Sequence, residues 1–299
     1  MKNKRLVSII IALIVFAVFG AGSYLFGDEI LDNKNINSNL QTENTIVVNY
    51  LDVGQGDSEF IQLPNGKCML IDASTSNYGT AIANRITALG YTKIDYLVAT
   101  HPHADHIGGM KQIVESFDIG EIYMPMVSTN TQTYENLLQA ISDKGLSIKT
   151  AKAGTVVLDE DELRMEMLAP VNSAYNGLNN YSAVIKIKYG DTVFLFMGDA
   201  EMLSESEIMS TYSKEDLKAD VLKVGHHGSN TASMPEFINA VSPKYAVIEV
   251  GEGNSYNHPH AEALEALDNV GAKVYRTDIK GNISVVSDKT DLKVYKEKG

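Results

Sequence analysis

The chain has 299 residues, a formal net charge of −13 and one cysteine. A single cysteine excludes an internal disulfide, so the core alone must stabilise the fold. The acidic balance and the lack of a basic stretch argue against an electrostatic track for a polyanion.

Residues 6–27 form an uncharged, mostly apolar run that follows lysine and arginine residues within positions 2–5. At ~1.5 Å per residue the run is long enough to cross a hydrocarbon core of ~30 Å. We therefore interpret residues 1–27 as a basic cytoplasmic end and a single transmembrane anchor, with the rest of the chain outside the cell. The alternative is a signal peptide cleaved near residues 21–23, which would make the protein secreted.

Residues 28–44 are rich in asparagine and charge and poor in large apolar side chains, which predicts a flexible linker. Residues 45–299 have the size of one α/β domain. Their apolar, β-prone runs predict strands at 45–53, 58–63, 68–72, 94–100, 121–126, 163–168, 182–188, 192–197, 220–224, 244–250, 273–276 and 282–286. Helical spacing predicts helices near 78–89, 106–117, 132–144, 200–212, 234–241 and 260–270. This order indicates two packed β-sheets flanked by helices.

All seven histidines fall in three short clusters, in the segments THPHADHIGG, KVGHHGS and NSYNHPH. A protein that used histidine merely as a surface or core residue would scatter some of them elsewhere. The clustering therefore indicates that the imidazoles serve a metal site, with His101, His103, His106, His226 and His227 as the candidate ligands.

The first cluster lies between a predicted strand and a predicted helix. Pro102 favours an extended backbone at His101, and residues i and i+2 of an extended segment point the same way, so His101 and His103 can bind one ion together. Asp105 and His106 follow at a turn, where their side chains can reach a second ion. The plainer alternative is a histidine-rich loop that binds metal adventitiously.

With these motifs the chain resembles the metallo-β-lactamase-fold hydrolases, whose metal motif has this form and this position at a strand end. More narrowly, it resembles the β-lactamase-like domain of ComEC-type DNA-uptake competence proteins and their stand-alone relatives. The matching segments run from about residue 45 to about residue 290 and include YLDVGQGDSEFIQLP, CMLIDAS, IDYLVATHPHADHIGG, NNYSAVIKIKYGDTVFLFMGDA, DVLKVGHHGS and YNHPH.

The resemblance implies a four-layer αββα sandwich that holds one or two divalent metal ions, with zinc expected and manganese as the alternative. His101 and His103 would serve the first metal site, Asp105 and His106 the second, and Asp199 would bridge both.

The pair His226 and His227 would complete a site with one imidazole and place the other nearby. The sequence does not say which histidine does which, because Gly225 is expected to end the preceding strand.

One departure concerns the first site. Many members of the superfamily supply a further histidine from the middle of the chain, but here none occurs between His106 and His226. Relatives in this branch have an Asn-Asn-x-Ser element, matched by Asn179, Asn180 and Ser182. An amide oxygen is a weak zinc ligand, so we expect a looser first site.

Two further departures exclude related branches. His103 stands where the diiron oxygen-reducing branch has glutamate. Cys68 lies in an apolar strand-like run far upstream of the site motifs, which predicts a buried structural residue instead of a metal ligand.

The expected chemistry is hydrolysis without a covalent intermediate. Two divalent ions lower the pKa of a shared water from ~15.7 toward ~7 and stabilise negative charge at the atom attacked. Asp105 and Asp199 would organise this water, and Asn179, Ser182 and Ser229 offer neutral groups that suit phosphate oxygens. For Ser229 the structural alternative is a cap on the following turn.

His258 is assigned to the substrate side of the site, where it would donate a hydrogen bond to a phosphoryl oxygen or protonate the leaving group. Pro259 favours an extended His258, while His260 stands at the start of the next predicted helix. The alternative is a histidine that only fixes the loop.

The resemblance suggests a phosphodiester substrate outside the cell, with DNA as the leading candidate. The net charge of −13 keeps smaller envelope phosphoesters as alternatives. A different class is a membrane-tethered metal-binding or scaffold protein with little activity, against which the intact ligand set argues. The sequence identifies no protein partner.

Overall fold

The computed structural model describes residues 29–30 and 40–299. The predicted anchor lies outside the described residues, as does most of the predicted linker. Within the described part of the chain, no helix combines the length and apolar character needed to cross a membrane.

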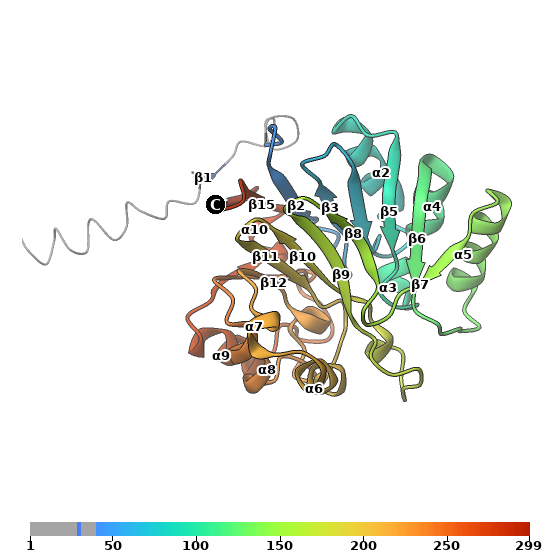
Figure 1. Ribbon diagram of the computed structural model, residues 1–299. Helices are drawn as coiled ribbons and strands as arrows, with labels where there is room; N and C mark the ends of the chain where they lie inside the picture. The colour runs from blue at the N-terminus through green and yellow to red at the C-terminus, as the bar shows by residue number, and fades with distance from the viewer. Residues whose placement is uncertain (1–28, 31–39) are drawn as a thin grey trace, which may run out of the picture.

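The described residues form two mixed β-sheets (Figure 1). The first sheet has the order β1-β16-β15-β2-β3-β4-β5-β6-β7. Its strands β4 to β7 run parallel, so their carboxyl ends share one edge. In chain order the strands are β1 (Glu29–Ile30), β2 (Ile46–Tyr50), β3 (Glu59–Gln62), β4 (Cys68–Ile71), β5 (Lys93–Val98), β6 (Asp118–Met124), β7 (Ile148–Thr150), β15 (Ile283–Ser287) and β16 (Leu292–Lys296).

The second sheet has the order β14-β13-β12-β11-β10-β9-β8. Its strands β11 to β14 are parallel, which again places several carboxyl ends at one edge. The strands are β8 (Val156–Glu160), β9 (Leu163–Ala169), β10 (Val184–Tyr189), β11 (Thr192–Phe196), β12 (Val221–Lys223), β13 (Tyr245–Ile248) and β14 (Lys273–Arg276).

Helices cover the outer face of each sheet (Figure 1). The first sheet packs against α2 (Gly79–Ala88), α4 (Met110–Ser116) and α5 (Gln132–Asp143). The second packs against α6 (Met202–Thr211), α7 (Lys214–Leu217), α8 (Pro235–Val241) and α9 (Ala261–Asn269). Shorter pieces are α3 (Ala104–Ile107), α10 (Thr277–Lys280) and the 3₁₀ turns η1 (Asn179–Tyr181) and η2 (Gly225–Gly228).

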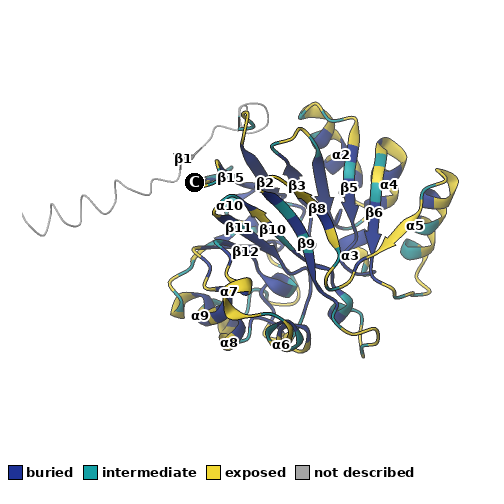
Figure 2. Ribbon diagram, in the orientation of Figure 1, coloured by how far each residue is buried: buried dark blue, intermediate teal, exposed yellow. Residues whose placement is uncertain are grey.

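Three apolar layers hold this architecture together: one between the sheets and one under each set of helices. In the central layer the rings of Tyr50 and Phe196 stack across the two sheets, with centroids 6.1 Å apart. All five residues of β2 are buried because helices and the second sheet cover both faces of the first sheet (Figure 2). The prediction of two packed sheets flanked by helices is confirmed.

The structure differs from the sequence-based prediction at several elements. The single helix expected over 106–117 is broken at Gly108 and Gly109. At Gly109 a Cβ would lie 2.3 Å from the backbone oxygen of Ala73, so this break lets two backbones approach closely. The prediction also missed β7, β8, β16, α7 and α10.

Candidate metal centre

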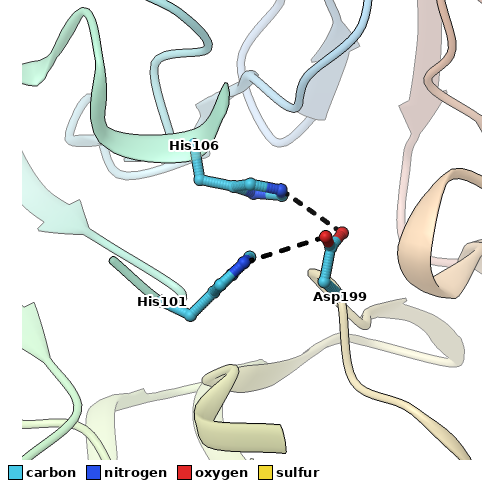
Figure 3. Close-up of side chains that lie close together, drawn as sticks. All are labelled: His101, His106 and Asp199. Carbon is cyan, nitrogen blue, oxygen red and sulfur yellow. Dashed lines mark ion pairs between the residues drawn. The ribbon is translucent and has the colours of Figure 1, made fainter. Parts of the chain in front are cut away.

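The candidate metal ligands come from the carboxyl ends of strands in both sheets. His101 and His103 follow β5 of the first sheet, and His103 is the N-cap residue of α3, which carries Asp105 and His106. Asp199 follows β11, and the His226-His227 pair follows β12. Figure 3 shows His101 and His106 approaching the Asp199 carboxylate from one side of the site.

One group of ligands converges on the Oδ1 atom of Asp199. This oxygen lies 3.3 Å from His106 Nε2 and 3.5 Å from His227 Nε2. His227 Nε2 is also 3.7 Å from Asp105 Oδ2. His106 Nε2, His227 Nε2 and Asp199 Oδ1 are all buried without a hydrogen-bond partner. Most buried polar atoms in folded proteins have a hydrogen-bond partner, so the convergence of these three unpartnered ligand atoms fits a divalent cation.

A second group faces the other oxygen of Asp199. Its Oδ2 lies 3.7 Å from both His101 Nε2 and His226 Nε2. His103 Nδ1 is 2.9 Å from His101 Nε2, and the Asn179 amide lies 3.4 Å from His226 Nε2. The two carboxylate oxygens of Asp199 therefore face two groups of candidate ligands.

In the structure, His226 and His227 face different groups of candidate ligands. His227 joins His106 and Asp105, whereas His226 faces the group of His101 and His103. The two histidines diverge because both adopt a left-handed backbone, with φ of 48° and 53°. Non-glycine residues rarely take this conformation, and such strain concentrates at functional sites.

The Nδ1 atoms of the first group have hydrogen-bond partners that direct each Nε2 inward. His106 Nδ1 lies 2.7 Å from Asp72 Oδ2. His227 Nδ1 lies 2.9 Å from the backbone oxygen of Glu249 and 3.2 Å from Asp57 Oδ1. Such outer partners fix the tautomer and orientation of a metal-ligating histidine.

Two histidines of the second group, His101 and His226, also have Nδ1 partners outside the cluster of candidate ligands. His101 Nδ1 lies 3.2 Å from Thr100 Oγ1 and 3.3 Å from Ser182 Oγ, and His226 Nδ1 lies 2.9 Å from Thr231 Oγ1.

The sequence analysis missed Asp72 and Asp57 as partners of these histidines. Both residues could have been found from the sequence, because each is an acidic residue next to an apolar strand-like run. They lie in the segments CMLIDAS and DVGQGDS, which contributed to the family resemblance but were assigned no function.

A buried ion pair lies behind the His227 ligand. Lys223, the last residue of β12, is fully buried and contacts Asp57. Burial alone would lower the lysine pKa, but Asp57, Glu59 and Glu249 raise it. Burial also raises the pKa of Glu249, to about 8. Lys223 is thus the positive centre of a buried acidic cluster, which no local sequence pattern predicts.

In the metal-free protein, neighbouring carboxylates favour the protonated form of His227. Burial would lower the pKa of His227, but Asp199 and Asp57 raise it to about 10. Burial would raise the pKa of Asp199, but His106 and His227 lower it well below its usual range. Because imidazole ligands must be neutral, metal binding at this cluster is expected to release protons.

A cavity of about 320 Å³ opens over the cluster. Its lining includes ligand residues together with Gln55, Asn179, Tyr256 and His258. His258 lies against both histidines of the pair, with ring centroids 5.6 Å from His226 and 6.3 Å from His227. Burial, followed by the effect of His227, lowers the His258 pKa to about 4.

The remaining predicted residues lie outside this lining. Ser182 is fully buried and accepts a hydrogen bond from the backbone of Asp199 at 3.1 Å. Ser229 accepts from the backbone N–H of Thr231 at 3.2 Å, which is the turn-capping contact. Contact of either serine with substrate stays a prediction. His260 is the N-cap residue of α9, as expected from its position.

Cys68 is buried in β4, where its Sγ lies 3.3 Å from the backbone oxygen of Lys93. Burial raises the pKa of this thiol to about 12, so it is a protonated core residue.

Residues 51–251 match the metallo-β-lactamase superfamily, and the chain belongs to that superfamily. The His/Asp cluster lies within these matched residues of the mixed α/β fold and offers ligands for a divalent metal ion, as a metal-dependent hydrolase of this superfamily requires.

Among characterised sequences, the chain is 32% identical over 253 residues to ComE operon protein 3 of Bacillus subtilis (strain 168), covering 79% of this chain and 32% of that protein. It is 30% identical over 239 residues to Competence protein ComA of Neisseria gonorrhoeae, covering 80% of this chain and 32% of that protein. The predicted resemblance to competence proteins is confirmed, and the chain spans about a third of the length of these relatives.

Among solved structures, CmlA, a diiron β-hydroxylase from Streptomyces venezuelae, aligns with a TM-score of 0.52 and 16% identity. The alignment covers 80% of this chain and 53% of that one. At this identity the likeness concerns the fold alone.

Proposed function

We propose that the chain is a metal-dependent phosphodiesterase that hydrolyses its substrate with activated water. The observation that carries the proposal is Asp199, whose two carboxylate oxygens face two separate imidazole groups beneath one open cavity. When bound, divalent ions supply Lewis acidity and an activated water for attack on phosphorus.

Residues that line the cavity are proposed to bind the metal ions and the substrate. Ligand residues of both groups line the cavity, among them Asp105, His226 and His227. The two carboxylate oxygens of Asp199 face these two groups. Asn179 and His258 also line the cavity, where they can bind phosphoryl oxygens.

Imidazole and carboxylate ligands without a thiolate suit zinc, and we propose one or two zinc ions with manganese as the alternative. We further propose that the enzyme acts outside the cell, held by residues 6–27 as an uncleaved anchor or secreted after cleavage.

DNA is the leading substrate because of the similarity to competence proteins. The net charge of −13 supports envelope phosphoesters as the alternative.

The test is a turnover panel with the purified protein and Zn²⁺ or Mn²⁺. It contains bis-p-nitrophenyl phosphate, single-stranded DNA, duplex DNA, p-nitrophenyl phosphocholine and nitrocefin. We expect hydrolysis of phosphodiesters but not nitrocefin, and loss of turnover with a chelator. Failure of the metal-loaded protein to hydrolyse any phosphodiester would overturn the proposal and favour a binding or scaffold role.

A further inference from the structure

Tyr256 stands at the edge of the cavity, on the loop between β13 and α9. Its ring lies nearly parallel to that of His258, with an interplanar angle of 25° and centroids 5.6 Å apart. His258 in turn lies at 25° to the His227 ring. Three near-parallel rings therefore lead outward from a metal ligand. The outermost residue, Tyr256, is 60% exposed, which leaves a flat aromatic face open to solvent.

Protein contacts hold the loop between β13 and α9 in place. The Asn254 side-chain oxygen accepts hydrogen bonds from the backbone of Tyr256 at 3.2 Å and of His258 at 3.0 Å. Its amide nitrogen donates to the backbone oxygens of Gly251 and His258 at 3.0 and 2.8 Å. Gly251 donates to the Gln55 side chain at 3.2 Å, which ties the loop to the segment between β2 and β3. Because the loop is already held by these contacts, binding costs little conformational entropy at Tyr256. The loss of entropy therefore takes little from the binding free energy of a stacking contact.

The exposed ring of Tyr256 favours a nucleobase over a quaternary ammonium group as its ligand. A quaternary ammonium group such as choline is recognised by several aromatic rings that form a cage, whereas Tyr256 offers one open face. A nucleobase needs a single aromatic face, and it stacks there whatever its identity. The acidic chain also lacks a basic stretch to bind a polyanion, so affinity for a nucleic acid must come from the metal centre and from contacts to bases.

We propose that Tyr256 is a base-stacking platform that binds the nucleobase next to the scissile phosphodiester. The inference rests on the phosphodiesterase function proposed above and names its substrate class as nucleic acid with unstacked bases. Tyr256 acts in substrate binding and specificity and takes no part in the chemical step. A base within duplex DNA is already stacked, so single strands are the preferred form.

The test compares two fluorescent decamers with the same sugar-phosphate backbone. One is a thymidylate decamer and the other carries only abasic tetrahydrofuran residues, so neither has an aromatic leaving group. The ratio of their kcat/KM values measures the contribution of the base. We expect this ratio to fall about 5- to 150-fold in Tyr256→Ala, the range for loss of one base-aromatic contact. Tyr256→Phe should keep the ratio because it keeps the ring.

Two further variants sharpen the result. Tyr256→Leu keeps the apolar bulk without a π face, so a ratio like that of wild type would overturn stacking in favour of plain apolar contact. Tyr295→Ala removes a half-buried tyrosine on β16, outside the cavity lining, and should keep the ratio.

The outcomes separate this inference from the proposed function. Equal cleavage of both decamers by wild type, or an unchanged ratio in Tyr256→Ala, overturns the base platform and leaves the phosphodiesterase intact. Absence of turnover on both decamers and on bis-p-nitrophenyl phosphate overturns the phosphodiesterase and the base platform with it.

Discussion

Replacing Lys223 by methionine should strongly destabilise the protein. Methionine nearly conserves the side-chain volume, so the change removes the charge without a large cavity. The lysine is fully buried and contacts Asp57, with Glu59 and Glu249 close enough to raise its pKa. Removing one partner of a buried ion pair costs ~3–5 kcal/mol because the other charge stays buried and uncompensated. With three carboxyl groups around this one lysine, we expect about 4 kcal/mol.

The measurement is urea unfolding followed by circular dichroism, with metal removed so that ion binding does not contribute to stability. Lys111→Met is the control, since Lys111 pairs with Glu115 on the exposed face of α4 and should lose less than about 0.5 kcal/mol. The double variant Asp57→Asn/Lys223→Met should recover part of the loss. A loss below about 1 kcal/mol in Lys223→Met, or strict additivity in the double variant, would refute the reasoning.

Three further predictions concern the site and its surroundings. Asp199→Ala should bind less than half an equivalent of metal by elemental analysis and lose turnover by several orders of magnitude; more than a tenth of wild-type activity contradicts this. His258→Ala should lose turnover while keeping its metal, whereas His260→Ala should keep both; unchanged turnover in the first rejects a substrate-side role. Burial raises the pKa of Glu205 from 4.5 to about 7 although two backbone N–H groups donate to it. The folded state then binds more protons than the unfolded state, so stability falls as pH rises from about 4.5 through 7. The free energy of unfolding should therefore fall less between pH 5 and pH 8 in Glu205→Gln than in wild type. Equal pH dependence of this free energy in the two proteins would contradict the prediction.

The sequence was informative where a single residue type dominates a short segment. The HPHADH and HHG segments predicted candidate ligands that the structure brings together, because clustered imidazoles serve few purposes other than metal binding. Apolar runs such as those of β2 and β5 identified strands because both faces of their sheet are covered.

Other features depend on contacts between distant segments. The separate roles of His226 and His227 follow from two successive left-handed residues, which no local pattern of the sequence requires. Asp57 reaches His227 and Lys223 across more than 160 positions, so no local pattern could pair them. β7 was missed because its three residues are exposed and lack an apolar repeat.

The ligands come from both sheets, which gives a bound ion a mechanical role besides its chemical one. His101 and His106 follow strand β5 of the first sheet, while Asp199 and His227 belong to connections of the second. Ions held by these residues would crosslink the two halves of the sandwich at the edge that carries the candidate ligands. At a free concentration of 100 times its dissociation constant, such an ion adds about 2.7 kcal/mol to folding stability. The survival time of the protein in its surroundings thus depends on how much free metal those surroundings contain.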